Sequence, residues 1–368
     1  MSNTLGATVH LAGQVAKVGM FAAVHELGAR WAKSRAGEAG ASRPGSSDAK
    51  QSDLPEQTSQ RNYPNRGDIL QALRDLIARD AALVSDGICQ PLTDFDRSPL
   101  DIAARLREMF ADIPKSAERS ASEDRQEVRT EVETDGLPEY YTQNFHYQTG
   151  GYLTSESARI YDMQVETLFS GTAAAMRRQA LRPIADALAG KDQRRMRLLD
   201  VACGTGRLLG EVARAFPALP LAGVDLSAAY ITEARTHLGD RRHATLETGN
   251  AEALPYLDAS FDIATCCFLF HELPAPVRRT ALAEMARVLK PGGTLVFIDS
   301  MQHGDAPAFD GMLDAFPDRF HEPYYRQYLD DDLDAAMHDV GLVRDGAWNA
   351  FLSKVMVRRR TADRSPTR

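Results

Sequence analysis

The second half of the chain repeats one pattern: a short apolar segment, a turn that often contains glycine, and a helix-like segment. The clearest apolar segments are residues 196–201, 220–225, 261–268 and 294–299. Such alternation predicts a mostly parallel β-sheet covered by helices on both faces. In the final run, residues 341–360, two strand-like pieces meet near Asp345-Gly346, a dipeptide suited to a hairpin turn.

The amino-terminal part has a different composition. Residues 5–33 carry apolar side chains at three- and four-residue steps, which predicts a helix, and two later stretches that are poor in large apolar residues read as linkers. The predicted organisation is a helix at 1–33, a disordered linker at 34–66, a small helical unit at 67–113, a linker at 114–137, a main α/β domain at 138–360 and a disordered tail at 361–368.

The length of the chain limits the number of folded units, and its net charge limits the kinds of ligand that it can bind. With 368 residues, of which 43% are hydrophobic, the chain can bury one large core and a smaller helical unit. A formal net charge of −8 argues against a nucleic-acid-binding surface, which needs clustered basic residues.

The first helix is also the best candidate for membrane contact. His10, Gln14 and Lys17 interrupt its apolar run, so we do not expect it to span a bilayer. Two alternatives stay open for residues 1–33: attachment to a membrane surface, and packing on the body of the protein.

The cysteines give no sign of a metal site or a disulfide framework. Cys89, Cys203, Cys266 and Cys267 show neither a C-x-x-C spacing nor histidines in zinc-finger order. A reducing cytoplasm is the simplest setting, and no metal is expected.

The first predicted strand of the main domain leads into the turn Gly204-Thr205-Gly206. Glycines there let the backbone approach a ligand at the carboxyl edge of the sheet, although this signal alone is weak. The dinucleotide pattern Gly-x-Gly-x-x-Gly is broken, because Leu209 stands at its third glycine and Gly210 comes one residue late. The carboxylate of Asp200 favours a cationic ligand such as S-adenosylmethionine over a pyrophosphate.

The second predicted strand ends in Asp225, about twenty residues after the glycine turn. A carboxylate at this place can accept hydrogen bonds from both hydroxyls of a ribose. Nicotinamide dinucleotides and S-adenosylmethionine are both bound in this way. Asp225 therefore indicates a ligand that contains a ribose but does not distinguish between these two cofactors.

Several motifs in a fixed order resemble those of class I methyltransferases, in particular the type 11 branch, which includes the ubiquinone/menaquinone C-methyltransferases. The resemblance is clear over residues 155–300 and fainter to residue 360, and residues 1–135 have no counterpart. The motifs are residues 198–206, Asp225, residues 249–255, Ser260-Phe261-Asp262 and residues 287–293.

This resemblance implies a Rossmann-like sheet of seven strands, mostly parallel with the last one antiparallel, and S-adenosylmethionine as the cofactor. In the family pattern Asp225 binds the ribose and Asn250-Ala251 lies at the adenine edge. Asparagine replaces the usual aspartate at 250, which keeps an acceptor for the adenine amine but loses the charge. The expected cofactor residues are Asp200, Ala202, Gly204, Thr205, Gly206, Asp225, Leu226, Asn250, Ala251 and Phe268.

Two residues are candidates for catalysis. His271 follows the predicted strand 261–268 and Asp299 ends the next one, so both should lie at the carboxyl edge where the methyl group is transferred. His321-Glu322 forms a weaker third candidate. Neither His-Glu pair belongs to a His-Glu-x-x-His motif, so a zinc site is not expected.

Aromatic residues are the candidates for the pocket of the methyl acceptor. The stretch 140–147 is rich in rings, which either pack on neighbouring helices or line a ligand pocket. The predicted pocket residues are Tyr147, Tyr152, Phe270, Tyr324 and Tyr325.

Taken together, these features predict a methyltransferase that uses S-adenosylmethionine and acts on a small aromatic or lipophilic acceptor. Two alternatives stay open. The extra helical unit could hold a polypeptide, which would make the acceptor a protein or peptide, or the chain could be a catalytically silent module that kept the cofactor fold.

Overall fold

The computed structural model describes residues 4–41, 62–91, 98–122, 125–239 and 244–361. Its centre is a seven-stranded sheet in the order β3-β2-β1-β4-β5-β7-β6. All neighbours are parallel except β7, which is antiparallel to both β5 and β6. The strands are β1 (Leu198–Val201), β2 (Leu221–Asp225), β3 (Ala244–Thr248), β4 (Phe261–Cys267), β5 (Leu289–Ser300), β6 (Leu342–Ala350) and β7 (Ser353–Arg360).

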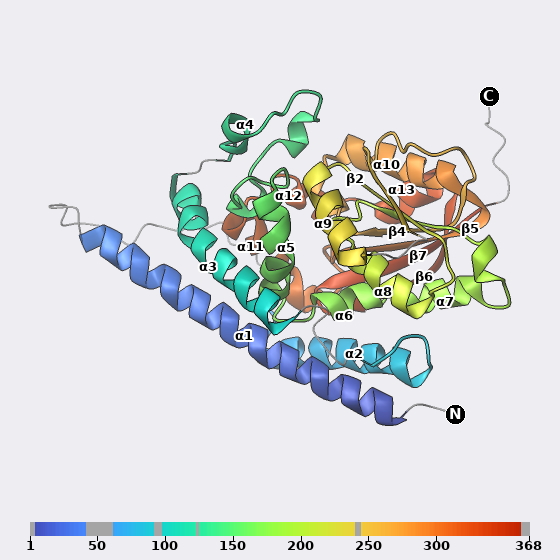
Figure 1. The fold of residues 1–368 in the computed structure, drawn as a ribbon, viewed down its shortest axis with the longest axis horizontal. Helices are drawn as coiled ribbons and strands as arrows, with labels where there is room; N and C mark the ends of the chain where they lie inside the picture. The colour runs from blue at the N-terminus through green and yellow to red at the C-terminus, as the bar shows by residue number, and fades with distance from the viewer. Residues whose placement is uncertain (1–3, 42–61, 92–97, 123–124, 240–243, 362–368) are drawn as a thin grey trace.

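Alternate strand residues face opposite layers of helices, as the period of two in a β-strand requires. In β1, Leu198 faces a core shared with α6 to α9, and Leu199 faces a core shared with α10 and α13. Figure 1 shows α7 and α8 below the sheet and α10 and α13 above it. The helices are α6 (Ala173–Arg178), α7 (Leu181–Leu188), α8 (Arg207–Ala215), α9 (Ala228–Leu238), α10 (Ala275–Val288), α11 (Asp310–Arg319), α12 (Tyr325–Leu329) and α13 (Leu333–Asp339).

The predicted fold class is therefore confirmed, including the reversed final strand. The hairpin turn, however, was placed wrongly. The chain reverses at Phe351-Leu352, where Phe351 has a φ of +59°, whereas Asp345-Gly346 lies within β6 at an irregularity in its pairing with β7. The short strand β3 was not predicted.

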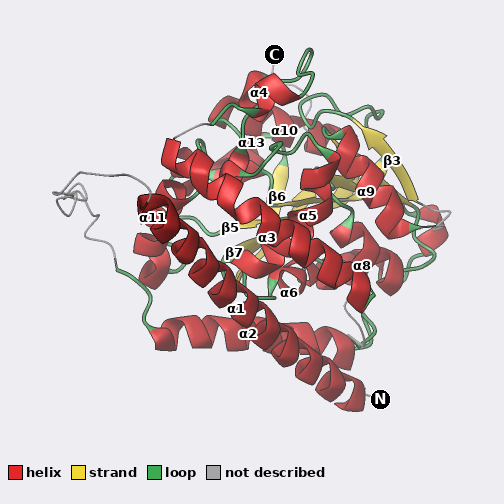
Figure 2. Ribbon diagram, turned by 60° about the vertical axis from the view of Figure 1, so that its left-hand side comes forward, coloured by secondary structure: helices red, strands yellow, loops and turns green. Residues whose placement is uncertain are grey.

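The amino-terminal helices pack around one side of this domain (Figures 1 and 2). They are α1 (Thr4–Ala41), α2 (Arg66–Ser85), α3 (Pro99–Ser122), the single turn α4 (Val128–Glu131) and α5 (Ser155–Leu168). Leu76 and Leu83 of α2 belong to the same core as β1, so α2 extends the helical layer over that face of the sheet.

Helix ends differ from the predictions in two places. α1 continues to Ala41, past the predicted end at residue 33, and α3 continues through Pro114 to Ser122, where a linker was expected. α2 begins at Arg66, where Asn65 caps it and Asp68 completes a capping box. Residues 42–61 of the predicted linker and residues 362–368 of the predicted tail lie outside the described residues.

In α1, several polar side chains face the protein and several apolar side chains face outward, the reverse of a usual surface helix. His10, Gln14 and Lys17, which interrupt its apolar run, are all buried against the protein, whereas Leu5 and Val15 are 78% and 57% exposed. His10 Nε2 lies 2.7 Å from Asp80 Oδ2 of α2, and Lys17 Nζ lies 3.0 Å from Glu166 Oε1 of α5. The same helix contains Thr4–Gly28, a segment long and apolar enough by length and composition to cross a membrane.

Candidate active site

The glycine turn after β1 forms one wall of a cavity at the carboxyl edges of β1, β2 and β4, which we call the glycine-turn cavity. Gly204 has a φ of +54°, and a Cβ added there would meet no atom within 4 Å, so the cavity side of the turn is open because the residue is glycine. Ala202 also has a positive φ, +55°. The cavity is lined by Tyr140, Tyr141, Tyr152, Tyr161, Ala202, Gly204, Asp225, Leu226, Tyr230, Gly249, Asn250, Ala251, Cys267, Phe268, Leu269, Glu272, Leu273 and Val277.

Asp225 is fixed at the end of β2 by two backbone N–H groups. Gly204 N donates to its Oδ2 at 2.8 Å, and Ser227 N donates to its Oδ1 at 2.9 Å. Burial raises the pKa of Asp225 above its usual range. A carboxylate held in this way keeps free lone pairs that face the cavity.

Three predicted cofactor residues lie behind the cavity wall. Asp200 is buried and accepts a hydrogen bond of 2.6 Å from Thr265 Oγ1, and its burial raises its pKa to about 7. Thr205 Oγ1 donates to Asp162 of α5, which ties the turn to that helix. Gly206 begins α8 with a φ of +75°, and a Cβ there would crowd Ala234 at 3.1 Å. These residues shape the turn without lining the cavity.

A second cavity adjoins the first, and we call it the aromatic cavity. Its volume is about 310 Å³. Tyr161, Phe268 and Glu272 line both cavities and form their common wall. Most of the remaining lining is apolar and comes from α5, α11 and the residues around them: His25, Tyr63, His146, Val165, Leu168, Phe169, His271, Ser300, Met312, Leu313, Ala315, Phe316, Arg319, Phe320, Tyr325 and Leu352.

The two predicted catalytic residues are in contact: His271 lines the aromatic cavity, and Asp299 is fully buried behind it. His271 Nδ1 is 2.6 Å from Asp299 Oδ1, and Asp299 Oδ2 accepts hydrogen bonds from the backbone N–H groups of Leu269 and Phe270. Burial lowers the pKa of His271, but the neighbouring Asp299 raises it more, to about 10. The contact with Asp299 therefore favours the protonated form of the imidazole, in which both ring nitrogens carry a hydrogen.

The predicted acceptor-pocket residues separate into different places. Tyr325 lines the aromatic cavity, and its hydroxyl lies 2.6 Å from Ser300 Oγ, whereas Tyr152 lines the glycine-turn cavity. Phe270 was placed wrongly: it is fully buried against Phe297 in the core, because the backbone turns at the end of β4. Tyr147 and Tyr324 line neither cavity.

The aromatic residues of the stretch 140–147 divide between the two predicted roles, lining a cavity and packing in the interior. Tyr140 and Tyr141 line the glycine-turn cavity, while Phe145 is buried and stacks on Tyr152 with ring centroids 5.2 Å apart. Glu272, Glu322 and His146 also meet at this site, and no motif had singled out the three together.

The sheet order, the reversed β7 and the cavity at the glycine turn agree with the architecture that the resemblance to class I methyltransferases implies. Residues 198–293 match the family described as methyltransferase domain. The match supports the predicted class for this part of the chain.

Two curated relatives come from quinone biosynthesis. The chain is similar to the ubiquinone/menaquinone biosynthesis C-methyltransferase UbiE of Methylobacterium nodulans, with 35% identity over 43% of this chain and 62% of the relative. It is also similar to the demethylmenaquinone methyltransferase of Deinococcus radiodurans, with 38% identity over 38% of this chain and 55% of the relative. The chain thus spans less than two thirds of the length of either relative.

Among solved structures, a putative sarcosine dimethylglycine methyltransferase from Galdieria sulphuraria is similar with a TM-score of 0.40 and 16% identity. The similarity covers 52% of this chain and 87% of that chain.

Proposed function

We propose that this protein transfers a methyl group from S-adenosylmethionine to a small lipophilic acceptor, and that the two adjoining cavities hold the two reactants. The observation that carries the proposal is the common wall of Tyr161, Phe268 and Glu272. Methyl transfer needs donor and acceptor in line, and two adjoining cavities that share one wall are suited to this requirement.

The glycine-turn cavity suits S-adenosylmethionine. The open space at Gly204 leaves room for the methionine part, the Asp225 carboxylate can accept from the ribose hydroxyls, and Asn250 can accept from the adenine amine. Once bound, the cofactor supplies a methyl group on a sulfonium, so no covalent enzyme residue is required. The Asp225 carboxylate at the wall of this cavity favours its positive charge.

The aromatic cavity suits a lipophilic acceptor. Phe316 of α11, Phe320 after it and Phe169 after α5 give it apolar walls, which favour an aromatic or isoprenoid molecule over a polar peptide. The quinone-biosynthesis names of the two relatives agree with this class of acceptor.

His271 is proposed to donate a hydrogen bond to the acceptor, and Asp299 to position its ring. Asp299 occupies Nδ1, which leaves Nε2 toward the cavity. Replacing His271 with alanine should lower turnover of the acceptor by about 100-fold and leave the affinity for S-adenosylmethionine within about twofold. Equal losses of turnover and cofactor affinity would mean that His271 only supports the fold.

We also propose that α1 attaches the protein to a membrane surface. Its exposed side carries Leu5, Val9, Leu11 and Val15, and no charged residue lies on that side between Thr4 and Val24. A helix whose His10 and Lys17 are already paired with acidic groups of the protein can lay its apolar side on lipid. A lipophilic acceptor would then be close to the enzyme in the membrane.

The cofactor assignment is tested by calorimetry with S-adenosylmethionine and its demethylated product. Replacing Asp225 with alanine removes the acceptor for the ribose hydroxyls and should cost about 2–3 kcal/mol of binding free energy, roughly a 30- to 150-fold loss of affinity. Asp258→Ala, at an exposed carboxylate remote from the cavity, should change nothing. Absence of binding by the unaltered protein at millimolar cofactor would refute the proposal.

A further inference from the structure

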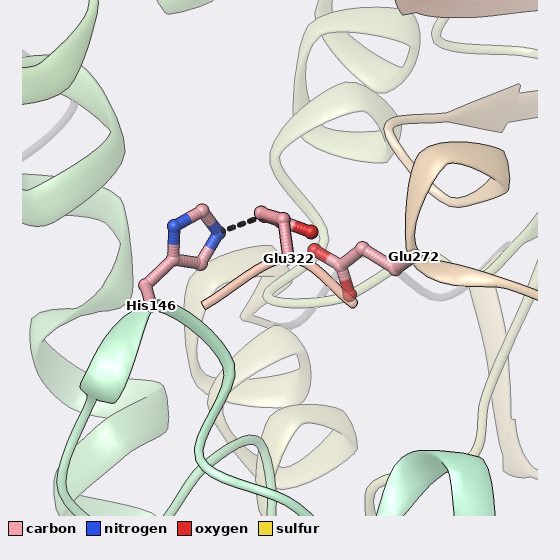
Figure 3. Close-up of side chains that lie close together, drawn as sticks. All are labelled: His146, Glu272 and Glu322. Carbon is pink, nitrogen blue, oxygen red and sulfur yellow. Dashed lines mark ion pairs between the residues drawn. The ribbon is translucent and has the colours of Figure 1, made fainter. Parts of the chain in front are cut away.

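Three side chains from distant parts of the chain converge beside the two cavities. His146 comes from the short helix η2 (Phe145–Tyr147), Glu272 from η4 (Phe270–Glu272) and Glu322 from the segment between α11 and α12. One ligand-type atom of each lies within 4.8 Å of those of the other two. Figure 3 shows the three side chains pointing toward one another.

Each of the three is held in place by the surrounding structure. His146 and Tyr147 have φ values of +54° and +55°, and the backbone N–H of His146 donates to the carbonyl of His321, next to Glu322. Tyr152 OH donates to Glu272 Oε1 at 2.7 Å. Non-glycine residues in this backbone region persist only where the surroundings enforce them, so the approach of His146 to Glu322 is built into the fold.

Glu322 lacks the hydrogen bonds that a buried carboxylate normally makes. It is 3% exposed, and neither of its oxygens has a hydrogen-bond partner among the described residues. His146 Nε2 lies 2.8 Å from Oε1, which is an ion-pair distance, but the contact does not have hydrogen-bonding geometry. A buried carboxylate in this state costs free energy unless a cation joins it.

The second carboxylate makes this cost larger. Glu272 places a second carboxylate beside Glu322, so the cluster has two acidic groups for one imidazole.

We propose that His146, Glu272 and Glu322 bind one divalent metal ion at the wall of the aromatic cavity. One imidazole and two carboxylates are a ligand set suited to Zn²⁺ or Mn²⁺, and a site with three protein ligands keeps positions open for another molecule. His146 and Glu272 line the aromatic cavity, so those positions would face the acceptor.

The consequence for the acceptor rests on the proposed function. A metal ion there binds an acceptor that carries an ionisable oxygen, such as a phenol or an enol, and lowers the pKa of that oxygen. Glu272 lines both cavities, so the bound oxygen would lie near the common wall. The local spacing in the sequence gives no hint of the site, because its ligands come from three separate segments.

The test uses the full chain, stripped with a chelator and titrated with MnCl₂, ZnCl₂ and MgCl₂ by calorimetry, with the spectrum of free Mn²⁺ followed by electron paramagnetic resonance. We expect one ion per chain. Glu322→Gln and Glu272→Gln should each weaken binding by at least about tenfold.

The matched control is Glu252→Gln. Glu252 accepts a hydrogen bond of 2.7 Å from Tyr140 OH, just as Glu272 does from Tyr152, but it lies outside the cluster. Its ion affinity should equal that of the unaltered protein. Thermal unfolding with and without the ion gives a second readout, because an ion that binds the folded state raises the melting temperature.

Two results would overturn the inference: no binding of any of the three ions at millimolar concentration, or equal affinity in all three variants. If S-adenosylmethionine still binds in the first case, the carboxylates share a proton and only the metal site fails. If the ion binds and S-adenosylmethionine does not, the proposed function fails and the metal site stands.

Discussion

Asp200 is a carboxylate buried behind the glycine turn, and none of the ion pairs found among the described residues includes it. Its pKa is raised to about 7 by burial, with a smaller contribution from Asp225, and the hydrogen bond from Thr265 only partly offsets this. The folded protein therefore holds a proton on Asp200 that the unfolded chain releases near pH 4.

This difference predicts how stability depends on pH. A raised native pKa adds stability that is fully present below about pH 4 and is lost as the pH rises through about 7, at up to about 1.4 kcal/mol per pH unit. Asp200→Asn removes the titration. Urea unfolding of the cofactor-free protein from pH 4 to 8 should show the unaltered protein losing stability relative to the variant, and a constant difference would contradict this account.

At the residue scale, the sequence predicted the lining of the glycine-turn cavity better than that of the aromatic cavity. Ala202, Gly204, Asp225, Asn250 and Phe268 all line the glycine-turn cavity, because they follow strands whose carboxyl ends meet at one edge. The lining of the aromatic cavity depends on loops and on α11, whose positions come from tertiary packing. Local sequence therefore gave no reason to separate Phe270, in the core, from Tyr325, in the cavity.

At the scale of elements, buried charges join the amino-terminal helices to the α/β domain. Asp80 of α2 accepts from the Arg178 guanidinium of α6 at 2.8 and 2.6 Å and lies 2.7 Å from His10 of α1. Arg178 also reaches Glu211 of α8 at 3.3 Å. One carboxylate thus connects three helices in a region from which water is excluded.

Breaking this connection should be costly. Asp80→Asn keeps the size of the side chain and removes its charge, which leaves the buried Arg178 under-compensated, so we expect a loss of about 3–5 kcal/mol in the free energy of unfolding. Asp86→Asn is the control: Asp86 follows the same helix and pairs with Arg182, but both side chains are largely exposed. Denaturant unfolding should show a change below about 1 kcal/mol for the control.

The helix ends were harder to predict than the helices. α3 begins at Pro99 directly after Ser98, and α5 begins at Ser155 after its cap Thr154, so both starts carry local capping or first-turn signals. The continuation of α3 through Pro114 has no local signal, since proline normally ends a helix. Its last turns are instead held by tertiary contacts, such as that of Arg119 with Glu127 at 2.8 Å.

At the scale of the whole molecule, the exposed apolar side of α1 lies on the outside of the helical layer (Figure 2). The proposed membrane attachment predicts that the protein sediments with vesicles of phosphatidylcholine and phosphatidylglycerol. Replacing Leu5 and Val15 with serine removes about 1.5 kcal/mol of apolar burial each and should weaken partitioning by about 100-fold.

The matched control for that experiment is Leu257→Ser, at a side chain that is 84% exposed on the α/β domain. It should sediment like the unaltered protein. A protein that stays in the supernatant at every lipid concentration would show that the apolar side of α1 serves another purpose.

The polar side chains of α1 that face the protein are synthesised well before the residues that they contact. His10 finds its partner Asp80 only 70 residues later in the chain, and Lys17 finds Glu166 later still. At roughly 5–20 residues per second, His10 is synthesised about 4–14 seconds before Asp80. During that interval His10 cannot contact Asp80, so the proposed membrane-binding helix is made before the part of the chain that engages its polar side.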